Sequence, residues 1–108
     1  MSQITTHVLD VALGRPAAAV PVNLERADGS LVAAASTGPD GRAGDLGPEH
    51  LPPGTYRLVF DTAAYFAATA QTGFYPRVSV EFHLTDPTAR YHVPLLLSPF
   101  AYSTYRGS

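Results

Sequence analysis

The stretch VSVEFHL, residues 78–84, alternates between apolar and polar side chains along its whole length. Its even-numbered positions hold Val, Val, Phe and Leu, whereas its odd-numbered positions hold Ser, Glu and His. Successive side chains of a β-strand point to opposite faces, so this alternation predicts a strand with one buried and one solvated face. Residues 55–60, TYRLVF, predict a second strand of this kind.

Residues 20–26, VPVNLER, predict a third alternating strand, with two Val and one Leu on its buried face. Pro21 lies on the opposite parity. Because proline cannot donate a ladder hydrogen bond, it predicts that this strand lies at a sheet edge or contains a bulge. The following ADGS, residues 27–30, predicts a hairpin turn with Asp-Gly at its centre.

Further short segments typical of strands lie before and after these residues in the sequence. Ten Pro and nine Gly divide the chain into short segments, which is typical of an all-β sandwich or barrel. The further predicted strands span residues 4–13, 31–37, 91–97 and 101–106, with a brief strand near residues 43–46. Residues 38–54 form a long polar connection, whose length indicates a functional or disordered loop.

Only one segment, DTAAYFAATAQTG at residues 61–73, predicts a helix. Asp61 or Thr62 can cap its start, and Gly73 can end it. The apolar residues that repeat at helical spacing are Ala63, Phe66, Ala67 and Ala70. The sequence therefore predicts seven or eight strands and one short helix.

The composition limits the class of protein. A chain of 108 residues with 45% apolar residues predicts a single globular domain, residues 1–108. The net charge of −2 argues against a nucleic-acid partner, and the absence of Cys excludes disulfides, zinc–thiolate sites and thiol catalysis. The start of the chain lacks a signal-peptide pattern, and no apolar stretch approaches the ~20 residues of a membrane span, so we expect a cytoplasmic protein without membrane association.

Two histidines and one arginine are candidates for chemistry. His7 lies in the middle of the first predicted strand, on an apolar parity where a histidine is more often a core residue than a catalyst. His92 opens the apolar strand VPLLL, and the same alternative applies to it. Arg42 lies beside a glycine turn, where an arginine is usually solvated but can also clamp a planar anion. His50 and His83 look like a loop residue and a solvent-face residue.

The candidates would suit amide hydrolysis if the fold brought them together. One neutral imidazole can take a proton from water, while an imidazolium can donate a proton. Arg42 could stabilise a developing negative charge, and the terminal carboxylate of Ser108 could orient an imidazole as an Asp does in a triad. Periodicity alone cannot bring His7 and His92 together. No HxH or HExxH spacing occurs, so we expect no metal and no other cofactor.

The final segment, YHVPLLLSPFAYSTYRGS at residues 91–108, closely resembles the C-terminal signature of the 5-hydroxyisourate hydrolase family, the transthyretin-related enzymes of urate breakdown. THVLDVALGRPA at 6–17 resembles the family's first strand and turn, and DGRAGDL at 40–46 resembles its Asp-Gly-Arg loop. GTYRLVFDTAAYF at 54–66 and FYPRVSVEFHL at 74–84 resemble its central strand–helix unit and next strand. The similarity covers essentially the whole chain, and the Tyr-Arg-Gly-Ser ending is its most specific element.

The resemblance implies a transthyretin-like (prealbumin-like) β-sandwich of seven to eight strands with one short helix, in agreement with the strand pattern. It also implies a homotetramer, a dimer of dimers, with active sites in clefts at the dimer–dimer interface. The implied substrate is 5-hydroxyisourate. Water attacks a carbonyl of its six-membered ring, the N1–C6 amide bond breaks, and 2-oxo-4-hydroxy-4-carboxy-5-ureidoimidazoline forms.

The residues match the family's site positions one by one. The match implies catalytic roles for His7, Arg42, His92 and Ser108. It implies substrate-binding roles for His7, Arg42, Tyr105, Arg106 and Gly107. We expect His92 or His7 to activate water, Arg42 to stabilise the oxyanion, and the Ser108 end to orient a histidine.

Departures from the family pattern are mild: the 38–54 loop and the 26–33 hairpin carry few charges, and one residue differs in the C-terminal motif. Ala101 stands where the family usually has Gly, which affects only the local turn. A transthyretin-type carrier would bind a small aromatic ligand without catalysis, and a plain interaction domain is also compatible with a sandwich. The two histidines, Arg42 and the polar ending favour the enzyme, because a carrier channel would be lined more heavily by apolar groups.

Overall fold

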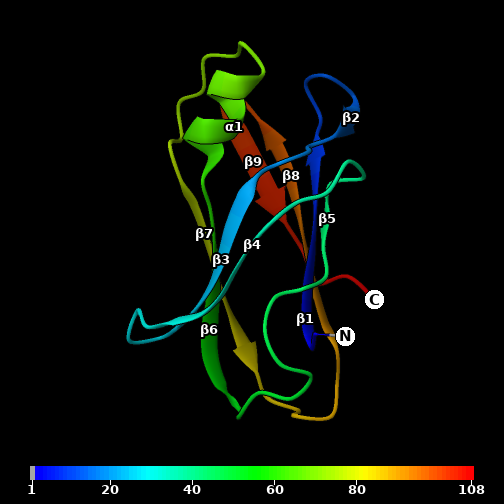
Figure 1. Ribbon diagram of the computed structural model, residues 1–108, viewed down its shortest axis with the longest axis vertical. Helices are drawn as coiled ribbons and strands as arrows, with labels where there is room; N and C mark the ends of the chain where they lie inside the picture. Colours follow the sequence, from blue (N-terminus) through cyan, green and yellow to red (C-terminus); the bar gives the residue numbers. More distant parts are fainter. Residues whose placement is uncertain (1) are drawn as a thin grey trace.

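The computed structural model of the chain describes residues 2–108, which contain nine strands and one short helix (Figure 1). Two of these strands have only two residues each, so seven strands of four residues or more remain. The elements in chain order are β1 (Ile4–Asp10), β2 (Arg15–Pro16), β3 (Pro21–Arg26), β4 (Leu31–Ser36), β5 (Arg42–Ala43), β6 (Gly54–Phe60), α1 (Thr62–Ala68), β7 (Val78–Leu84), β8 (Tyr91–Ser98) and β9 (Ala101–Thr104).

The strands form two sheets. In one sheet, β1 pairs with β8, which runs parallel to it, and on its other edge with the short strands β2 and β5; β9 lies outside β8. In the other sheet the order is β4–β3–β6–β7, and every pair is antiparallel. The predicted sandwich with one short helix is therefore confirmed.

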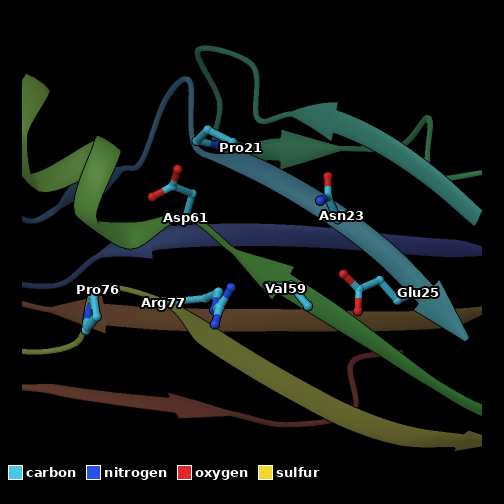
Figure 2. A pocket seen from close by; sticks show the side chains of 7 residues that line it. All are labelled: Pro21, Asn23, Glu25, Val59, Asp61, Pro76 and Arg77. Atoms are coloured by element: carbon cyan, nitrogen blue, oxygen red, sulfur yellow. The ribbon is translucent and has the colours of Figure 1, made fainter. Parts of the chain in front are cut away.

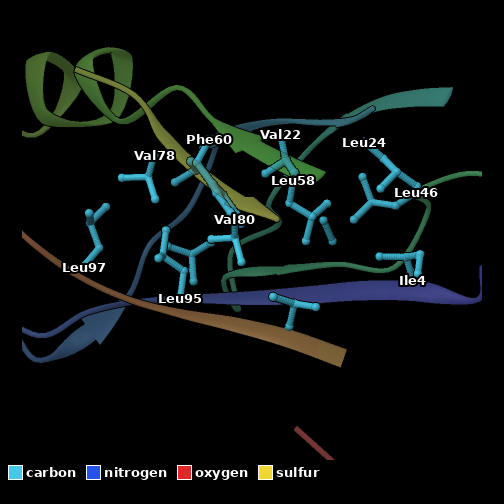
Figure 3. Packing of buried hydrophobic residues seen from close by; sticks show 14 of the residues in the cluster. Ile4, Val22, Leu24, Leu46, Leu58, Phe60, Val78, Val80, Leu95 and Leu97 are labelled. Carbon is cyan, nitrogen blue, oxygen red and sulfur yellow. The ribbon is translucent and has the colours of Figure 1, made fainter. Parts of the chain in front are cut away.

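The core fills the space between the two sheets (Figure 3). In the VSVEFHL strand, Val78, Val80 and Leu84 are buried, Phe82 is half-buried, and the polar residues are exposed, as the alternation predicts. Burying one such aliphatic side chain stabilises a fold by about 1.5–3 kcal/mol, so the alternating faces hold the sheets together. The other fully buried large side chains include Ile4, Val8, Val22, Leu24, Leu58, Phe60, Leu95 and Leu97.

The strand β3 is a central strand, so the edge position predicted from Pro21 is wrong. It pairs with β4 on one side and with β6 on the other. Pro21 is tolerated because it is the first residue of the strand. A bulge does occur, but it lies between Leu24 and Glu25. The predicted Asp-Gly hairpin follows, with the Gly29 N–H donating to the Arg26 carbonyl at 2.9 Å.

The helix α1 is shorter than predicted, because it ends at Ala68 and does not reach Gly73. Asp61 caps its start, as predicted, by accepting a backbone N–H hydrogen bond with its side chain. Ala70 takes the left-handed conformation that glycine usually supplies after a helix, with a φ of 56°. The next N–H groups then bond back to carbonyls of the last turn, which ends the helix there.

The buried face of α1 also differs from the predicted one. Of the predicted apolar stripe only Phe66 is buried, and the exposed members are Ala63, Ala67 and Ala70. Tyr65 anchors the helix instead, because its hydroxyl donates to the Asp10 carboxylate of β1 at 2.6 Å. Burial and this hydrogen bond raise the pKa of Tyr65 to about 12. No helix within residues 2–108 is long and apolar enough to cross a membrane.

The connection over residues 38–54 is packed, not disordered. Its Leu46 and Leu51 are buried in the core. The strand β5 forms at Arg42–Ala43, slightly earlier than the strand predicted near residues 43–46, and pairs with β1. The connection therefore holds Arg42 against the middle of β1.

Candidate functional site

The strand register brings together residues that lie far apart in the chain. Thr5 of β1 is opposite His92 of the parallel strand β8, and His7 of β1 is opposite Arg42 of β5. Directly opposed residues point to the same face of a sheet, and Thr5 and His7 share a parity. The alternate residues of β1, Ile4, Thr6 and Val8, are buried. The four side chains therefore lie together on the outer face of this sheet.

This outer face is hollowed into a pocket of about 430 Å³, within the usual range for small-molecule sites. Its lining residues come from β1, from β5 and β8 with one flanking residue each, and from the end of the chain: Thr5, Thr6, Arg42, Ala43, Gly44, Arg90, His92 and Ser108. Three of the expected catalytic residues are thus in the lining. The fourth, His7, lies beside it, across from Arg42. Both histidines are half-buried on the outer face, so neither is a core residue.

A hydrogen bond orients the His92 ring, and the surroundings of the ring lower its pKa. Its Nδ1 lies 2.8 Å from the Thr5 hydroxyl oxygen. A hydroxyl can donate or accept, so this hydrogen bond is compatible with either neutral tautomer of the ring. Burial lowers the pKa of His92, and the nearby positive charges of Arg42 and His7 lower it further. The lowered pKa favours the neutral form of His92, which is able to accept a proton.

The Asp-Gly-Arg turn orients His7 and Arg42. The Nε2–H of His7 donates to the Asp40 carbonyl at 2.8 Å. The Asp40 carboxylate accepts the backbone N–H of Arg42 at 3.0 Å, and its other oxygen lies 3.9 Å from the Arg42 Nε. Gly41 has a φ of 79°, and a Cβ there would collide with the carbonyl oxygen of Val8, so the turn requires glycine.

The end of the chain packs on His92. The Gly107 N–H donates to the His92 carbonyl at 2.8 Å, and the two residues form an antiparallel bridge beyond the end of β9. A Cβ on Gly107 would lie 2.6 Å from Cδ2 of the imidazole, so only glycine allows this approach. Ser108 then enters the pocket lining, and the chain end is seen crossing toward β1 in Figure 1.

Tyr105 and Arg106, which we expect to bind substrate, do not line this pocket. They line a separate hollow of about 230 Å³, together with residues of β7 and β8. The guanidinium carbon of Arg106 lies 4.5 Å from the centroid of the Tyr91 ring, which is within cation–π distance. In the C-terminal tail, residues 105–108, the Arg106 side chain therefore points toward Tyr91 and away from the pocket.

The residues of the site that sequence reasoning missed include Thr5, Asp40 and Arg90. Thr5 precedes His7 by two positions on the same strand, so parity could have identified it. Asp40 begins the Asp-Gly-Arg turn, but its contacts with His7 and Arg42 form only in the folded loop. Arg90 lines the pocket only because β1 and β8 run side by side, and no local sequence signal indicates that pairing.

A second hollow, of about 480 Å³, lies on the outer face of the other sheet (Figure 2). Its lining includes Glu25, Asp61 and Arg77 but no histidine. In residues 2–108, no group of three or more His, Asp or Glu side chains could hold a metal ion. The expected catalytic residues Arg42, His92 and Ser108 therefore gather at the β1–β5–β8 pocket and not at this second hollow.

The sequence profile of the HIUase/Transthyretin family matches residues 4–107. The chain belongs to this family. Mouse 5-hydroxyisourate hydrolase is 46% identical over 113 residues, covering 99% of this chain and 96% of the mouse protein. The structure of Klebsiella pneumoniae 5-hydroxyisourate hydrolase matches with a TM-score of 0.90 and 36% identity, covering 100% of this chain and 94% of that one.

The HIUase/Transthyretin family also includes a thyroxine-bound relative. Sea bream transthyretin in complex with thyroxine matches with a TM-score of 0.89 and 33% identity, covering 97% of this chain and 94% of that one. The resemblance stated from the sequence is thus confirmed, and the chain is a full-length homologue of 5-hydroxyisourate hydrolases. Because the fold is common to both kinds of relative, the choice between them depends on the side chains of the site.

Proposed function

We propose that this chain hydrolyses 5-hydroxyisourate in urate degradation. The observation that carries the proposal is the pocket in which His92, Arg42 and Ser108 meet, with His7 beside Arg42. Imidazoles and a guanidinium suit the attack of water on a ring amide. The substrate is supported by relatives named 5-hydroxyisourate hydrolase that align with nearly the whole chain.

In the proposed mechanism, His92 activates the water. Its lowered pKa favours the neutral form of the ring. When its Nδ1–H donates to the Thr5 hydroxyl, the Nε2 lone pair is available for a proton of the water. The water oxygen adds to the C6 carbonyl of the substrate as this proton moves to His92, and the carbonyl electron pair moves onto oxygen.

Arg42 and the returning proton complete the reaction. The Arg42 guanidinium stabilises the oxyanion. As the carbonyl re-forms, the C6–N1 bond breaks, its electron pair goes to N1, and N1 takes the proton from His92. The acid formed at C6 then releases its remaining proton to solvent, so the product carries a new carboxylate there. His7, held by the Asp40 carbonyl, binds the substrate beside Arg42, and Ser108 closes the pocket next to the base.

A carrier function has weaker support from this pocket. The sea bream relative binds thyroxine, so the shared fold can accept an aromatic ligand. The pocket here, however, is lined by two arginines, a histidine and Ser108, besides Thr5, whose hydroxyl bonds to His92. Such groups suit a polar, oxygen-rich substrate better than a hydrophobic aromatic one. A carrier would also leave its ligand chemically unchanged.

The fate of the water oxygen tests the proposed reaction. Freshly generated 5-hydroxyisourate is incubated with the protein in ¹⁸O-labelled water, and the product is examined by mass spectrometry and ¹³C NMR. We expect a ring-opened product with one labelled oxygen in its new carboxylate. A product that lacks the label, or that carries it at another carbon, contradicts the N1–C6 assignment. A parallel incubation without protein shows the spontaneous reaction.

Thr5→Val is expected to lower kcat/KM while preserving the shape of the side chain. It removes the hydroxyl that orients the His92 ring. One hydrogen bond is worth about 1 kcal/mol, so we expect a loss of roughly 5- to 10-fold. Thr5→Ser is the matched control, because it keeps the hydroxyl and should retain most of the activity. Equal kcat/KM for Thr5→Val and the wild type would show that this hydrogen bond has no role in catalysis.

The protein is expected to form a homotetramer, a dimer of dimers. Support comes from apolar side chains that remain exposed in the single chain: Val11, Leu13, Phe74, Phe100 and Tyr102. Where such side chains form one large contiguous apolar patch, the patch marks an interface. Multi-angle light scattering should give a mass near four times 11.4 kDa. A monomer with full hydrolase activity would contradict an active site at the dimer–dimer interface.

A further inference from the structure

The contact between Arg106 and Tyr91 lies outside the pocket. Tyr91 is, however, the residue directly before His92, the proposed general base. The Arg106 guanidinium carbon is 4.5 Å from the centroid of the Tyr91 ring. Tyr91 is buried, and its hydroxyl accepts the N–H groups of Thr85 and Asp86 at 3.2 and 2.9 Å. The ring is therefore a fixed platform, and a cation placed over its face is attracted to it.

The strand register explains the direction of Arg106. The pairing that joins β8 to β9 resumes at the bridge between His92 and Gly107. Side chains alternate along an extended chain, so Gly107 shares the outer face with His92, whereas Arg106 shares the inner side with Tyr91. Two consecutive residues of the tail are therefore attached to β8. Arg106 contacts Tyr91 on the inner side of the sheet, and Gly107 contacts His92 on the outer side.

We propose that Arg106 is a positioning residue that clamps the tail onto Tyr91, holds Gly107 against the His92 ring and directs Ser108 into the pocket. Gly107 has no side chain, so its own hold on β8 is one backbone hydrogen bond. The contact between Arg106 and Tyr91 supplies a second attachment of the tail, next to Gly107, which must stay against the His92 ring. The expected effect of this contact on catalysis rests on the proposed function. The attachment of the tail to Tyr91 does not depend on that function. This role differs from the substrate contact that the family resemblance implies for Arg106.

The clamp is tested first without substrate, by NMR of the intact protein. Arg106→Gln removes the cation, Arg106→Lys keeps it, and Arg77→Gln makes the same charge change beside the other sheet, just before β7. In Arg106→Gln we expect the Gly107 amide to exchange at least about fivefold faster, and the NOE between Gly107 Hα and His92 Hδ2 to disappear. Arg106→Lys should retain the NOE, and Arg77→Gln should match the wild type.

Steady-state kinetics then separate positioning from substrate binding. Arg106→Gln should lower kcat on the order of tenfold with little change in KM, and Arg106→Lys should recover much of the loss. A Gly107 amide as protected in Arg106→Gln as in the wild type overturns the clamp. A raised KM with unchanged kcat overturns the positioning role in catalysis and returns Arg106 to substrate binding. If Arg106→Gln frees Gly107 but the wild type hydrolyses no 5-hydroxyisourate, the clamp stands and the proposed function fails.

Discussion

Replacement of His92 by alanine is expected to lower kcat/KM by about 10²–10⁴-fold, the usual cost of losing a positioned acid–base group. His92 lines the pocket, its pKa is lowered by burial and by the charges of Arg42 and His7, and Thr5 orients its ring. The side chain is half-buried on the outer face and lies outside the core, so we expect little loss of stability. Stopped-flow absorbance and thermal denaturation measure the two effects separately.

Two further variants and one control complete this test. His7→Ala and Arg42→Ala should also reduce turnover strongly, because both side chains face the same side of the sheet as His92. His50→Ala is the control, since His50 is an exposed loop residue away from the pocket. Wild-type turnover in any of the three site variants, at an unchanged Tm, would remove that residue from the mechanism.

The pH dependence of Arg42→Ala should report on His92. The Arg42 charge is one cause of the lowered pKa of His92, so its removal raises that pKa. His92 must be neutral to accept a proton, and activity is lost as the pH falls through its pKa. The acid limb of the kcat/KM profile should therefore lie at higher pH in Arg42→Ala than in the wild type. An unshifted or oppositely shifted limb would show that His92 is not the base.

Removal of Tyr105–Ser108, or addition of a peptide after Ser108, is expected to lower kcat/KM by about 100-fold with little change in Tm. Removal takes Gly107 from the His92 ring and Ser108 from the pocket. An added peptide would start inside the pocket. In a chain that ends at Ser108, it would also replace an anionic carboxylate with a neutral amide. The strand β9 ends at Thr104, so its pairing with β8 should survive both changes.

The control for the extended protein is the same protein after scarless removal of the peptide by a self-cleaving intein. Activity should return when Ser108 is again the last residue. An N-terminal tag is a poor comparison, because Ser2 and Gln3 are buried. If the extended and processed proteins have equal kcat/KM, the terminal carboxylate has no catalytic role, and the polar ending would be explained by assembly.

The fold could be predicted from the sequence where the pattern was local. Residues 78–84 form the predicted strand with the predicted bounds, because alternation directly reports burial on one face. The end of α1 could not be predicted, since Ala70 occupies a left-handed position that sequence rules assign to glycine. The central place of β3 was also missed, because a proline at the first position of a strand breaks no central hydrogen bond.

The site could be predicted only through the family resemblance. His7 and His92 come together because β1 and β8 are parallel neighbours, and no local pattern specifies that pairing. Thr5 was missed because a threonine in a strand is ordinary, although its register opposite His92 gives it a specific contact. Arg106 was grouped with the pocket residues by motif, whereas the alternation of the tail directs it to Tyr91.

The ultraviolet absorbance of freshly prepared 5-hydroxyisourate, followed with and without the protein, tests the central claim most directly. The proposed hydrolase should accelerate the decay in proportion to protein concentration, and His92→Ala should abolish most of the acceleration. A decay that the wild-type protein leaves unchanged, or slows by sequestering the compound, would contradict the claim and would instead indicate a carrier.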